Sequence, residues 1–543
     1  MKVAELLIKC LENEGVKVMF GLPGEENLDV MDALHDSDIR FIQTRHEQGA
    51  AFMADVHGRL TREAGVCLAT LGPGATNLIT GVADAYLDRA PMVVLTGQAD
   101  LSRLHKESHQ HIDLVEMFRP ITKWNTQILS PPIVSEVMRK AFKMAQVEKP
   151  GPTHLDLPED VARMETNQAP LPVNRPRGGL PAEREIERAL EVIKNSNFPI
   201  VIAGNGVLRG QASEALTHFA EAFQIPVVNT FMGKGAISYK NPLYINTVGL
   251  QAEDPLYCGL ERSDLIVAVG YDLVEYAPRF WNPDSNKKII HIDTQPAEVD
   301  AYYNVQVGLI GGIQGSLKRL IARAYPRKKP NLPEIRDMIM GQLQAFRDDR
   351  SFPLKPQKII ADMRHVMGDD DIVIADVGAH KLWVARMYPC DLPNTCIISN
   401  GLAAMGIALP GAIAAKLHFP EKKVLAVMGD GGFMMNSQEL ETAIRAGTPF
   451  VTLIFRDGHY GVIRWKQLAR FNRASYADFQ NPDFVKYAES FGAKGYRVEA
   501  ANELVPIFKE AFEQKVPSVI DCPVDYSENT HLAEKLGDLI CPL

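Results

Sequence analysis

The sequence predicts an α/β protein with three domains, each of parallel sheet flanked by helices. Short apolar runs alternate with helical patterns along the chain, which is typical of parallel sheets with crossover helices. Two proline-rich stretches, at 166–181 and from 326 onward, interrupt this alternation. The chain has 543 residues, more than one hydrophobic core usually holds. We therefore expect domains at 1–165, 182–325 and 355–535.

The composition disfavours several classes of protein. Hydrophobic residues make up 46% of the chain and charged residues 23%, as in soluble globular enzymes. The net charge of −9, without a long basic block, disfavours binding to nucleic acid or to a membrane surface. Charged residues interrupt the helical pattern of residues 1–20, so we expect a first amphipathic helix there rather than a signal peptide or membrane span. Seven cysteines without paired or zinc-like spacing are typical of a reducing compartment, and we expect the cytoplasm.

In the first predicted domain, three apolar runs end at turns. Predicted strands end at Phe20, Thr44 and Leu71, and a glycine-rich or polar turn follows each one. The third domain repeats this plan with turns at 376–378 and 401–406. Open α/β sheets bind ligands where strands lead into helices. Two similar halves therefore predict one cofactor held between them.

The middle domain could be taken for a dinucleotide-binding domain. It has a strand over 199–203 before the turn 204–206, and a strand over 289–292 before Asp293. However, the third glycine of the dinucleotide fingerprint is missing and Asp293 lies too far along the chain. We expect a structural role for this domain rather than NAD binding.

Two carboxylates in the third domain directly follow predicted strands. Asp430 follows the apolar run 424–428, and Asp457, 27 positions later, follows the run 450–455. Parallel strands would bring both to the same sheet edge. A glycine-rich turn lets N–H groups approach phosphate oxygens, and a nearby Asp can hold the divalent cation that those phosphates also bind. The pattern predicts a diphosphate and metal site, although the turn 429–432 alone is also typical of an ordinary tight turn.

The segments 429–431 and 459–461, with Asp457 between them, resemble the cofactor-binding motif of thiamine-diphosphate enzymes. That family usually has Asn where this chain has Asp457, and the carboxylate keeps an oxygen ligand for magnesium. With Asp at this position, the chain resembles the FAD-independent, catabolic type of acetolactate synthase. The resemblance covers nearly the whole chain and implies thiamine diphosphate and Mg²⁺ as cofactors, held by a pyrimidine-binding first domain and a diphosphate-binding third domain. The implied metal ligands are Asp430, Asp457 and His459.

Activation of thiamine diphosphate requires a carboxyl group at its pyrimidine ring, and Glu47 is the candidate. It follows a predicted strand and opens the apolar segment 49–54, which would desolvate its carboxyl. A glutamate in the first turn of a helix, favoured by the helix dipole, is the ordinary alternative. The run from Arg45 to Ala54 is similar to the family pattern, and the resemblance implies that Glu47 is catalytic.

The resemblance implies further contacts with the cofactor. Met405 would hold the two cofactor rings in a bent shape, although an apolar residue there could also simply fill the core. The carbonyl of Ala403 would receive the amino group of the pyrimidine. The other expected cofactor-binding residues are Gly74, Asn77, Gly378, Ala379, His380, Gly429, Gly431, Gly432 and Tyr460.

The segment 105–111 is similar to the acetolactate synthase stretch whose Gln lies beside the substrate. We therefore expect Gln110 to act in catalysis on the substrate side, and His109 to lie near it. His105 and His109 would share one face of a helix and could suggest zinc. No partner cysteine or HExxH pattern accompanies them, so a metal site there is disfavoured.

Three features depart from biosynthetic members of the family. Residues 274–276 replace the pattern with which those members bind FAD, so FAD is not expected. Glu25 and Glu26 stand where the family has small residues, and a carboxylate facing the site would repel a second 2-oxo acid. Trp465 is one position out of register with the Trp that favours 2-oxobutyrate, so that preference is not carried over.

The activity that the resemblance implies is that of acetolactate synthase. Pyruvate is decarboxylated and the hydroxyethyl unit is joined to a second pyruvate, which gives 2-acetolactate and CO2. The family places the two cofactor-holding domains on different subunits, so we expect a homodimer or homotetramer with its active sites at subunit interfaces. Another thiamine-diphosphate-dependent 2-oxo acid decarboxylase or aldehyde carboligase is the nearest alternative, and Glu25 would favour it. A cofactor-binding protein without activity, or an NAD- or FAD-linked oxidoreductase, are further alternatives.

Overall fold

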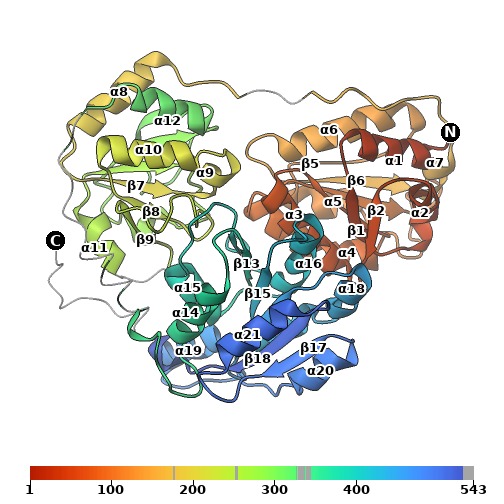
Figure 1. Ribbon diagram of the computed structural model, residues 1–543. Coiled ribbons are helices and arrows are strands. Elements are labelled where there is room, and N and C mark those ends of the chain that lie inside the picture. The colour runs from red at the N-terminus through yellow and green to blue at the C-terminus, as the bar shows by residue number, and fades with distance from the viewer. Residues whose placement is uncertain are drawn as a thin grey trace.

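The computed structural model describes residues 1–174, 178–250, 255–325, 327, 337, 341 and 344–529. Figure 1 shows three α/β lobes: the first domain (red to orange) and the middle domain (yellow to green) lie side by side, and the third domain (teal to blue) lies below both. Each lobe contains one six-stranded sheet in which every pairing is parallel. The predicted fold class is confirmed.

The sheet of the first domain has the strand order β2-β1-β3-β4-β6-β5. Its strands are β1 (Val18–Gly21), β2 (Arg40–Gln43), β3 (Gly65–Ala69), β4 (Met92–Gln98), β5 (Trp124–Gln127) and β6 (Pro152–Pro158). Its helices are α1 (Val3–Asn13), α2 (Leu28–His35), α3 (Glu47–Thr61), α4 (Pro73–Leu87), α5 (Leu114–Phe118), α6 (Val134–Gln146) and α7 (Glu159–Arg163). The expected first helix is therefore present as α1. Strands β3, β4 and β6 are buried along their whole length, as expected for a sheet covered by helices on both faces.

The sheet of the middle domain has the order β12-β11-β10-β7-β8-β9. Its strands are β7 (Pro199–Ala203), β8 (Val227–Asn229), β9 (Tyr244–Thr247), β10 (Leu265–Val269), β11 (Lys288–Asp293) and β12 (Val305–Ile310). Its helices are α8 (Glu183–Lys194), α9 (Asn205–Arg209), α10 (Ser213–Phe223), α11 (Pro255–Arg262) and α12 (Ile313–Ile321). This strand order is that of dinucleotide-binding folds.

The sheet of the third domain has the order β14-β13-β15-β16-β18-β17, the same topology as the first domain. Its strands are β13 (Ile372–Ala375), β14 (Cys396–Ile398), β15 (Val424–Gly429), β16 (Val451–Arg456), β17 (Lys494–Arg497) and β18 (Ser518–Pro523). Its helices are α14 (Pro356–Val366), α15 (Ala379–Met387), α16 (Ala408–His418), α17 (Asp430–Asn436), α18 (Glu439–Ala446), α19 (Gly461–Phe471), α20 (Phe484–Ser490) and α21 (Leu504–Glu513). The two similar halves that the sequence predicts thus share one strand order.

The first and third domains share a continuous hydrophobic core where α3 packs against α4 and α16. Small residues allow this close approach. A Cβ added at Gly411 of α16 would lie 2.8 Å from Cγ2 of Val56 on α3. These two domains are therefore packed together within one chain, and each can position residues of the other.

The exact domain limits stay a prediction. Residues 530–535 of the third predicted domain, and most of the second proline-rich stretch, lie outside the described residues. In the part of the chain that the structure describes, no helix has the length and apolar character needed to cross a membrane.

Candidate active site

Asp430 and Asp457 lie at one edge of the third sheet, as predicted. Strands β15 and β16 are neighbours, with Gly429 opposite Phe455, so the next residues of both strands leave the sheet together. Asp430 is buried, and its Oδ2 accepts hydrogen bonds from the N–H groups of Asp457 at 3.1 Å and Gly458 at 2.7 Å. The carboxylate of Asp430 thus fixes the turn that carries Asp457.

Asn481 is a third polar group at this position, and the sequence patterns did not single it out. Its Nδ2 donates to Oδ2 of Asp430 at 2.8 Å. Asn481 lies in a loop between α19 and α20, far along the chain from Asp430, so no local pattern indicates the contact.

The pair of carboxylates suits a divalent cation. Burial, and then the negative charge of Asp430, raise the pKa of Asp457 to about 6. A hard cation would relieve this repulsion. Among the described residues, no group of three or more His, Cys, Asp or Glu side chains is arranged around a common metal position. Nδ1 of His459 lies 2.8 Å from Oδ1 of Asp478, so this ring nitrogen is already paired with a carboxylate.

A pocket of about 820 Å³ lies against these carboxylates. Its expected cofactor-binding residues are Gly378, Ala379, His380, Ala403, Met405, Gly429, Gly431, Gly432 and Tyr460. The glycines are needed for space, because a Cβ added at Gly432 would lie 2.1 Å from Oδ2 of Asp376 and one at Gly431 would lie 2.9 Å from Cε1 of Tyr460. Helices α15 and α17 both begin here, and the first N–H groups of a helix have no acceptor within the helix, so a helix start suits an anion; the N–H of Gly431 is donated to Oδ1 of Asp430 at 3.0 Å.

Nε2 of His380, in the pocket wall, is buried and has no hydrogen-bond partner among the described residues, and the same holds for Oδ2 of Asp376, which lies behind Gly432. Burial lowers the pKa of His380 to about 3, so its ring is neutral. These features together fit a diphosphate with its metal ion. They are the space left by the glycines, the starts of α15 and α17, the unpartnered nitrogen of His380 and the pair of carboxylates.

The loop that carries Ala403 and Met405 adopts a strained shape beside this pocket. Ala403 has φ 58°, in the left-handed region that costs a non-glycine residue about 1–2 kcal/mol. Such strain persists where surrounding contacts enforce it. Oδ1 of Asp376 accepts the N–H of Gly406 at 2.7 Å from within the third domain.

Asp84 of α4 and Asp88, the residue directly after the end of α4, also hold this loop from the first domain. Asp84 accepts hydrogen bonds from Oγ of Ser399 at 2.8 Å and from the N–H of Ala404 at 3.3 Å. Asp88 accepts the N–H groups of Asn400 at 3.0 Å and Gly401 at 2.5 Å.

Arg59 of α3 partly neutralises these aspartates. Its guanidinium pairs with Asp55 at 2.6 Å, Asp84 at 2.8 Å and Asp88 at 2.6 Å, and all four side chains are almost completely buried. Three carboxylates face one guanidinium, and burial together with the neighbouring aspartates raises the pKa of Asp84. No sequence pattern had indicated this cluster. The spacing of Asp84 and Asp88 on an otherwise apolar helix indicates a shared face, but not what that face contacts.

Glu47 begins α3 and lies beside Asn77 and Gly74, as expected for residues of one site. Nδ2 of Asn77 donates to Oε2 of Glu47 at 3.0 Å. A Cβ added at Gly74 would lie 3.4 Å from Oε1 of Glu47. The carboxyl is only 5% exposed, so it is largely removed from water.

Within one chain, however, Glu47 does not reach the pocket that contains Asp430. The lining residues of that pocket, among those that the structure describes, all belong to the middle and third domains. Glu47, Gly74, Asn77 and Gln110 are not among them. The single chain therefore carries both halves of the predicted site but does not join them.

Glu439 of α18 positions the turn that carries Glu47. Its buried carboxylate accepts the N–H groups of Arg45 at 3.2 Å and His46 at 3.0 Å. A Cβ added at Gly49 would lie 2.7 Å from its Oε1, so the contact needs glycine there. Sequence patterns gave no sign of Glu439.

Gln110 lies beside the turn between β3 and α4, near the same sheet edge as Glu47. It has φ 58°, and its carbonyl oxygen would lie 2.6 Å from a Cβ added at Gly72. His105 and His109 are exposed in a segment of turns rather than a helix, so they do not share a helix face.

The two glutamates after the first glycine turn have different environments. Glu26 is buried, and its Oε2 accepts a hydrogen bond from Thr70 at 2.6 Å. Glu25 is exposed. The carboxylate of Glu26 is thus held by Thr70, which itself lies next to Gly74.

In the middle domain, Glu275 occupies the position at which a dinucleotide-binding turn holds phosphate. Its carboxylate accepts the N–H of Asn205 at 3.0 Å, at the start of α9 and directly after Gly204. It also accepts the N–H of Asp272 at 3.0 Å and the hydroxyl of Thr230 at 2.5 Å. The strand order is that of a dinucleotide fold, but the anion position is filled by the protein itself.

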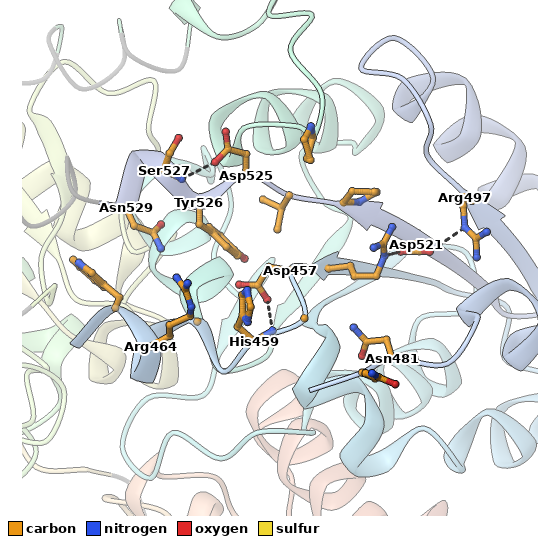
Figure 2. A pocket seen from close by; sticks show the side chains of 18 of the residues that line it. Asp457, His459, Arg464, Asn481, Arg497, Asp521, Asp525, Tyr526, Ser527 and Asn529 are labelled. Carbon is orange, nitrogen blue, oxygen red and sulfur yellow. Dashed lines mark hydrogen bonds and ion pairs between the residues drawn. The ribbon is translucent and has the colours of Figure 1, made fainter. Parts of the chain in front are cut away.

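A larger cavity of about 1200 Å³ adjoins the pocket, and both are lined by Asp457, His459 and Tyr526. Figure 2 shows Asp457 and His459 next to each other near Tyr526, with Arg497 paired to Asp521 at the far side. The carboxylate edge of the site is therefore open to a wide space.

Comparisons with known proteins agree with this geometry. Three family models match the chain: "Thiamine pyrophosphate enzyme, N-terminal TPP binding domain" at residues 1–117, "central domain" at 186–320 and "C-terminal TPP binding domain" at 376–522. The chain is 36% identical to an acetolactate synthase of Bacillus subtilis, over 98% of this chain and 94% of the relative. It is also 36% identical to a catabolic acetolactate synthase of Raoultella terrigena, over 98% and 97%. A probable acetolactate synthase large subunit of Methanocaldococcus jannaschii is 37% identical over 97% and 93%.

Proposed function

The chain belongs to the thiamine pyrophosphate enzymes, and within them to the acetolactate synthases, and on this premise we propose how its residues carry the reaction. It decarboxylates pyruvate and joins the hydroxyethyl unit to a second pyruvate, giving 2-acetolactate and CO2. The observation that carries this proposal is the glycine-rich pocket with two carboxylates, buried Asp430 and half-buried Asp457, at the ends of adjacent strands.

Bound thiamine diphosphate supplies the carbon nucleophile and the electron sink. The protein binds it through Asp430 and Asp457, which hold Mg²⁺, with the main-chain carbonyl of His459 as a further ligand. The N–H groups at the starts of α15 and α17 bind the diphosphate. The residues that we assign to diphosphate binding are Gly378, Ala379, His380, Gly429, Gly431, Gly432 and Tyr460.

Glu47 manages the proton at the pyrimidine end of the cofactor. Its largely buried carboxyl would hydrogen-bond to the ring nitrogen of the bound cofactor, and Asn77 holds that carboxyl in position by donating to Oε2. The main-chain carbonyl of Ala403 would receive the amino group of the pyrimidine. The apolar side chain of Met405 would hold the two cofactor rings in a bent shape. Gln110 acts on the substrate side, beside the same sheet edge.

The active form is a homodimer or a homotetramer built from such dimers. Glu47 does not line the pocket of its own chain, which supports a site completed by Glu47 of a second copy. Two equivalent sites then form across a two-fold interface.

No flavin or nicotinamide takes part. The carboxylate of Glu275 at the start of α9 supports this, because it would repel the diphosphate of a dinucleotide. We place the enzyme in the cytoplasm, since the cysteines with described side chains are free and buried, which suits a reducing compartment.

The test is to supply purified protein with pyruvate, thiamine diphosphate and Mg²⁺ and to measure both acetolactate and acetaldehyde. Acetolactate as the main product supports the proposal. Acetaldehyde, or products formed only with an added aldehyde, would instead assign a decarboxylase or an aldehyde carboligase. Release of no CO2 despite cofactor binding would mean an inactive cofactor-binding protein.

A further inference from the structure

A second cavity, of about 130 Å³, lies where the three domains meet. Its walls come from all three: Arg59, Arg62 and Arg89 from the first domain, Arg209 from the middle domain, and Ile398 from the third. One water needs about 10–15 Å³ by the same measure, so the cavity has room for a small ion with several waters. None of these arginines lines the cofactor pocket.

Arg209 has hydrogen-bonding capacity that the described residues do not use. Its Nη2 donates to Glu148 at 3.3 Å, but its Nε and Nη1 are buried without a hydrogen-bond partner. Nε of Arg89 is also buried without one, although Asp272 lies 3.6 Å away. Leaving buried donors of charged groups without acceptors is costly, so an acceptor in the cavity is expected.

The charge of the walls indicates the kind of acceptor. Four arginines line the cavity against one carboxylate, Glu148. Arg59 is engaged by its three aspartates, whereas Arg62 forms no ion pair among the described residues. Burial lowers the pKa of nearby Lys123 to about 8, and the positive charges of Arg89 and Arg209 contribute to that lowering against the opposing effect of Glu148. The side chains that line the cavity are therefore mostly cationic, and the carboxylates of Asp272, Asp293 and Glu275 behind them balance part of that charge, with Asp272 at 3.8 Å from Nη2 of Arg209, beyond hydrogen-bond distance.

We propose that this cavity is a binding site for a small oxyanion, held by Arg62, Arg89 and Arg209. Guanidinium groups present paired N–H donors that match both a phosphate and a carboxylate group. Both candidate ligands are compact oxyanions, but a phosphate and a carboxylate differ in charge and shape. The site is independent of the reaction proposed above, because its residues lie outside the cofactor pocket.

Isothermal titration of the protein saturated with thiamine diphosphate and Mg²⁺ tests this. Inorganic phosphate and acetate are titrated in separate arms at constant ionic strength and pH. We expect one saturable site per chain in at least one arm, and the arm that binds more tightly identifies the source.

Three variants assign the site. Arg62→Gln removes an exposed, unpaired arginine, so folding is not at stake, and affinity should fall about tenfold, as for loss of a charge-assisted hydrogen bond. Arg209→Lys keeps the charge and loses the planar fork, and should also weaken binding. Arg184→Gln is the matched control, because Arg184 is 83% exposed on α8 and does not line the cavity, so affinity should be unchanged.

The absence of saturable binding in both arms would overturn the proposal and assign the cavity to water. Equal binding by wild type, Arg62→Gln and Arg184→Gln would also overturn it, because the ion would then bind elsewhere. If Arg209→Lys strongly lowers the thermal midpoint of unfolding, its affinity is not used. The comparison of Arg62→Gln with Arg184→Gln then tests the proposal.

Discussion

Glu439 accepts the main-chain N–H of His46 at 3.0 Å, across 393 positions of the chain. The contact fixes the residue directly before Glu47 from the opposite domain. Asp88 makes the reverse contact, from the first domain to the N–H of Asn400 at 3.0 Å. Each of the two cofactor-binding domains therefore positions a turn that the other contributes to catalysis.

We predict that Glu47→Gln reduces turnover by a factor of about 10² or more, as loss of a positioned proton-transfer group does. Glutamine can still accept the hydrogen bond from Asn77, so the fold should be retained. Steady-state turnover, thermal midpoint and cofactor binding are to be measured together. Near-normal turnover in this variant would remove Glu47 from the mechanism.

A mixing experiment tests whether the site forms between two copies of the chain. Glu47→Gln and Asp430→Asn should each be inactive alone. In a mixed dimer, one site combines both defects and the other has neither, so random assembly should restore about a quarter of wild-type activity. The two variants are co-expressed and compared with each variant expressed alone. No recovery in verified mixed dimers would mean that each chain completes its own site.

We predict that Asp88→Asn weakens thiamine diphosphate binding about tenfold. An amide has one acceptor oxygen, so it cannot accept the N–H groups of both Asn400 and Gly401 as the carboxylate does. Half-saturation by the cofactor is measured by tryptophan fluorescence as well as by activity.

Asp55→Asn is the matched control for Asp88→Asn. Asp55 pairs with the same Arg59 but makes no contact with the loop over 399–404. Its replacement should leave cofactor affinity within about twofold of wild type. If both variants weaken cofactor binding equally, the charge of the cluster matters rather than the hydrogen bonds from Asp88 to the loop.

The free energy of unfolding should decrease as the pH rises from about 4.5 to about 7, because Glu275 titrates differently in the folded and unfolded chains. Burial, and then the negative charge of Asp272, raise the pKa of Glu275 from 4.5 to about 7. In this window the folded chain keeps a proton that the unfolded chain has released. The stabilisation from this group is therefore complete below the unfolded pKa and is lost as the pH rises through the folded pKa.

Glu275→Gln removes this titration, and its amide replaces the protonated carboxyl. The amide cannot accept at both of its terminal atoms, which costs a constant amount, but the difference in unfolding free energy between variant and wild type should shift in favour of the variant by up to about 3 kcal/mol between about pH 5 and about pH 8. Urea unfolding at both pH values measures this, with Glu187→Gln on the exposed face of α8 as the control. A difference that does not change with pH contradicts the prediction.

Local pattern was sufficient to predict the strands that carry the site. The runs before Asp430 and Asp457 became β15 and β16, and the expected strands over 199–203 and 289–292 match β7 and β11. Such segments are predictable because a strand buried on both faces must be a continuous apolar run. Glycine turns at their ends are predictable because only glycine leaves room there.

The contacts between domains could not be predicted in this way. Glu439 and Asp88 are single charged residues in ordinary helices, and nothing near them in the chain marks their partners. The burial of Glu26 against Thr70, and the carboxylate of Glu275 at the turn after β7, were also missed. In each case the partner lies in a different element, so the pairing depends on how the elements pack.

The sequence by itself determined the α/β class and the family, and it predicted residues for diphosphate, metal and pyrimidine because those roles need particular residue types at the ends of buried strands. The tertiary structure decided where these residues meet. It placed Glu47 away from the Asp430 pocket of its own chain and tied both catalytic turns to the opposite domain. The physical reason is that the packing of α3 against α16 fixes the two sheets relative to each other, and that packing depends on shape complementarity between segments far apart in the chain.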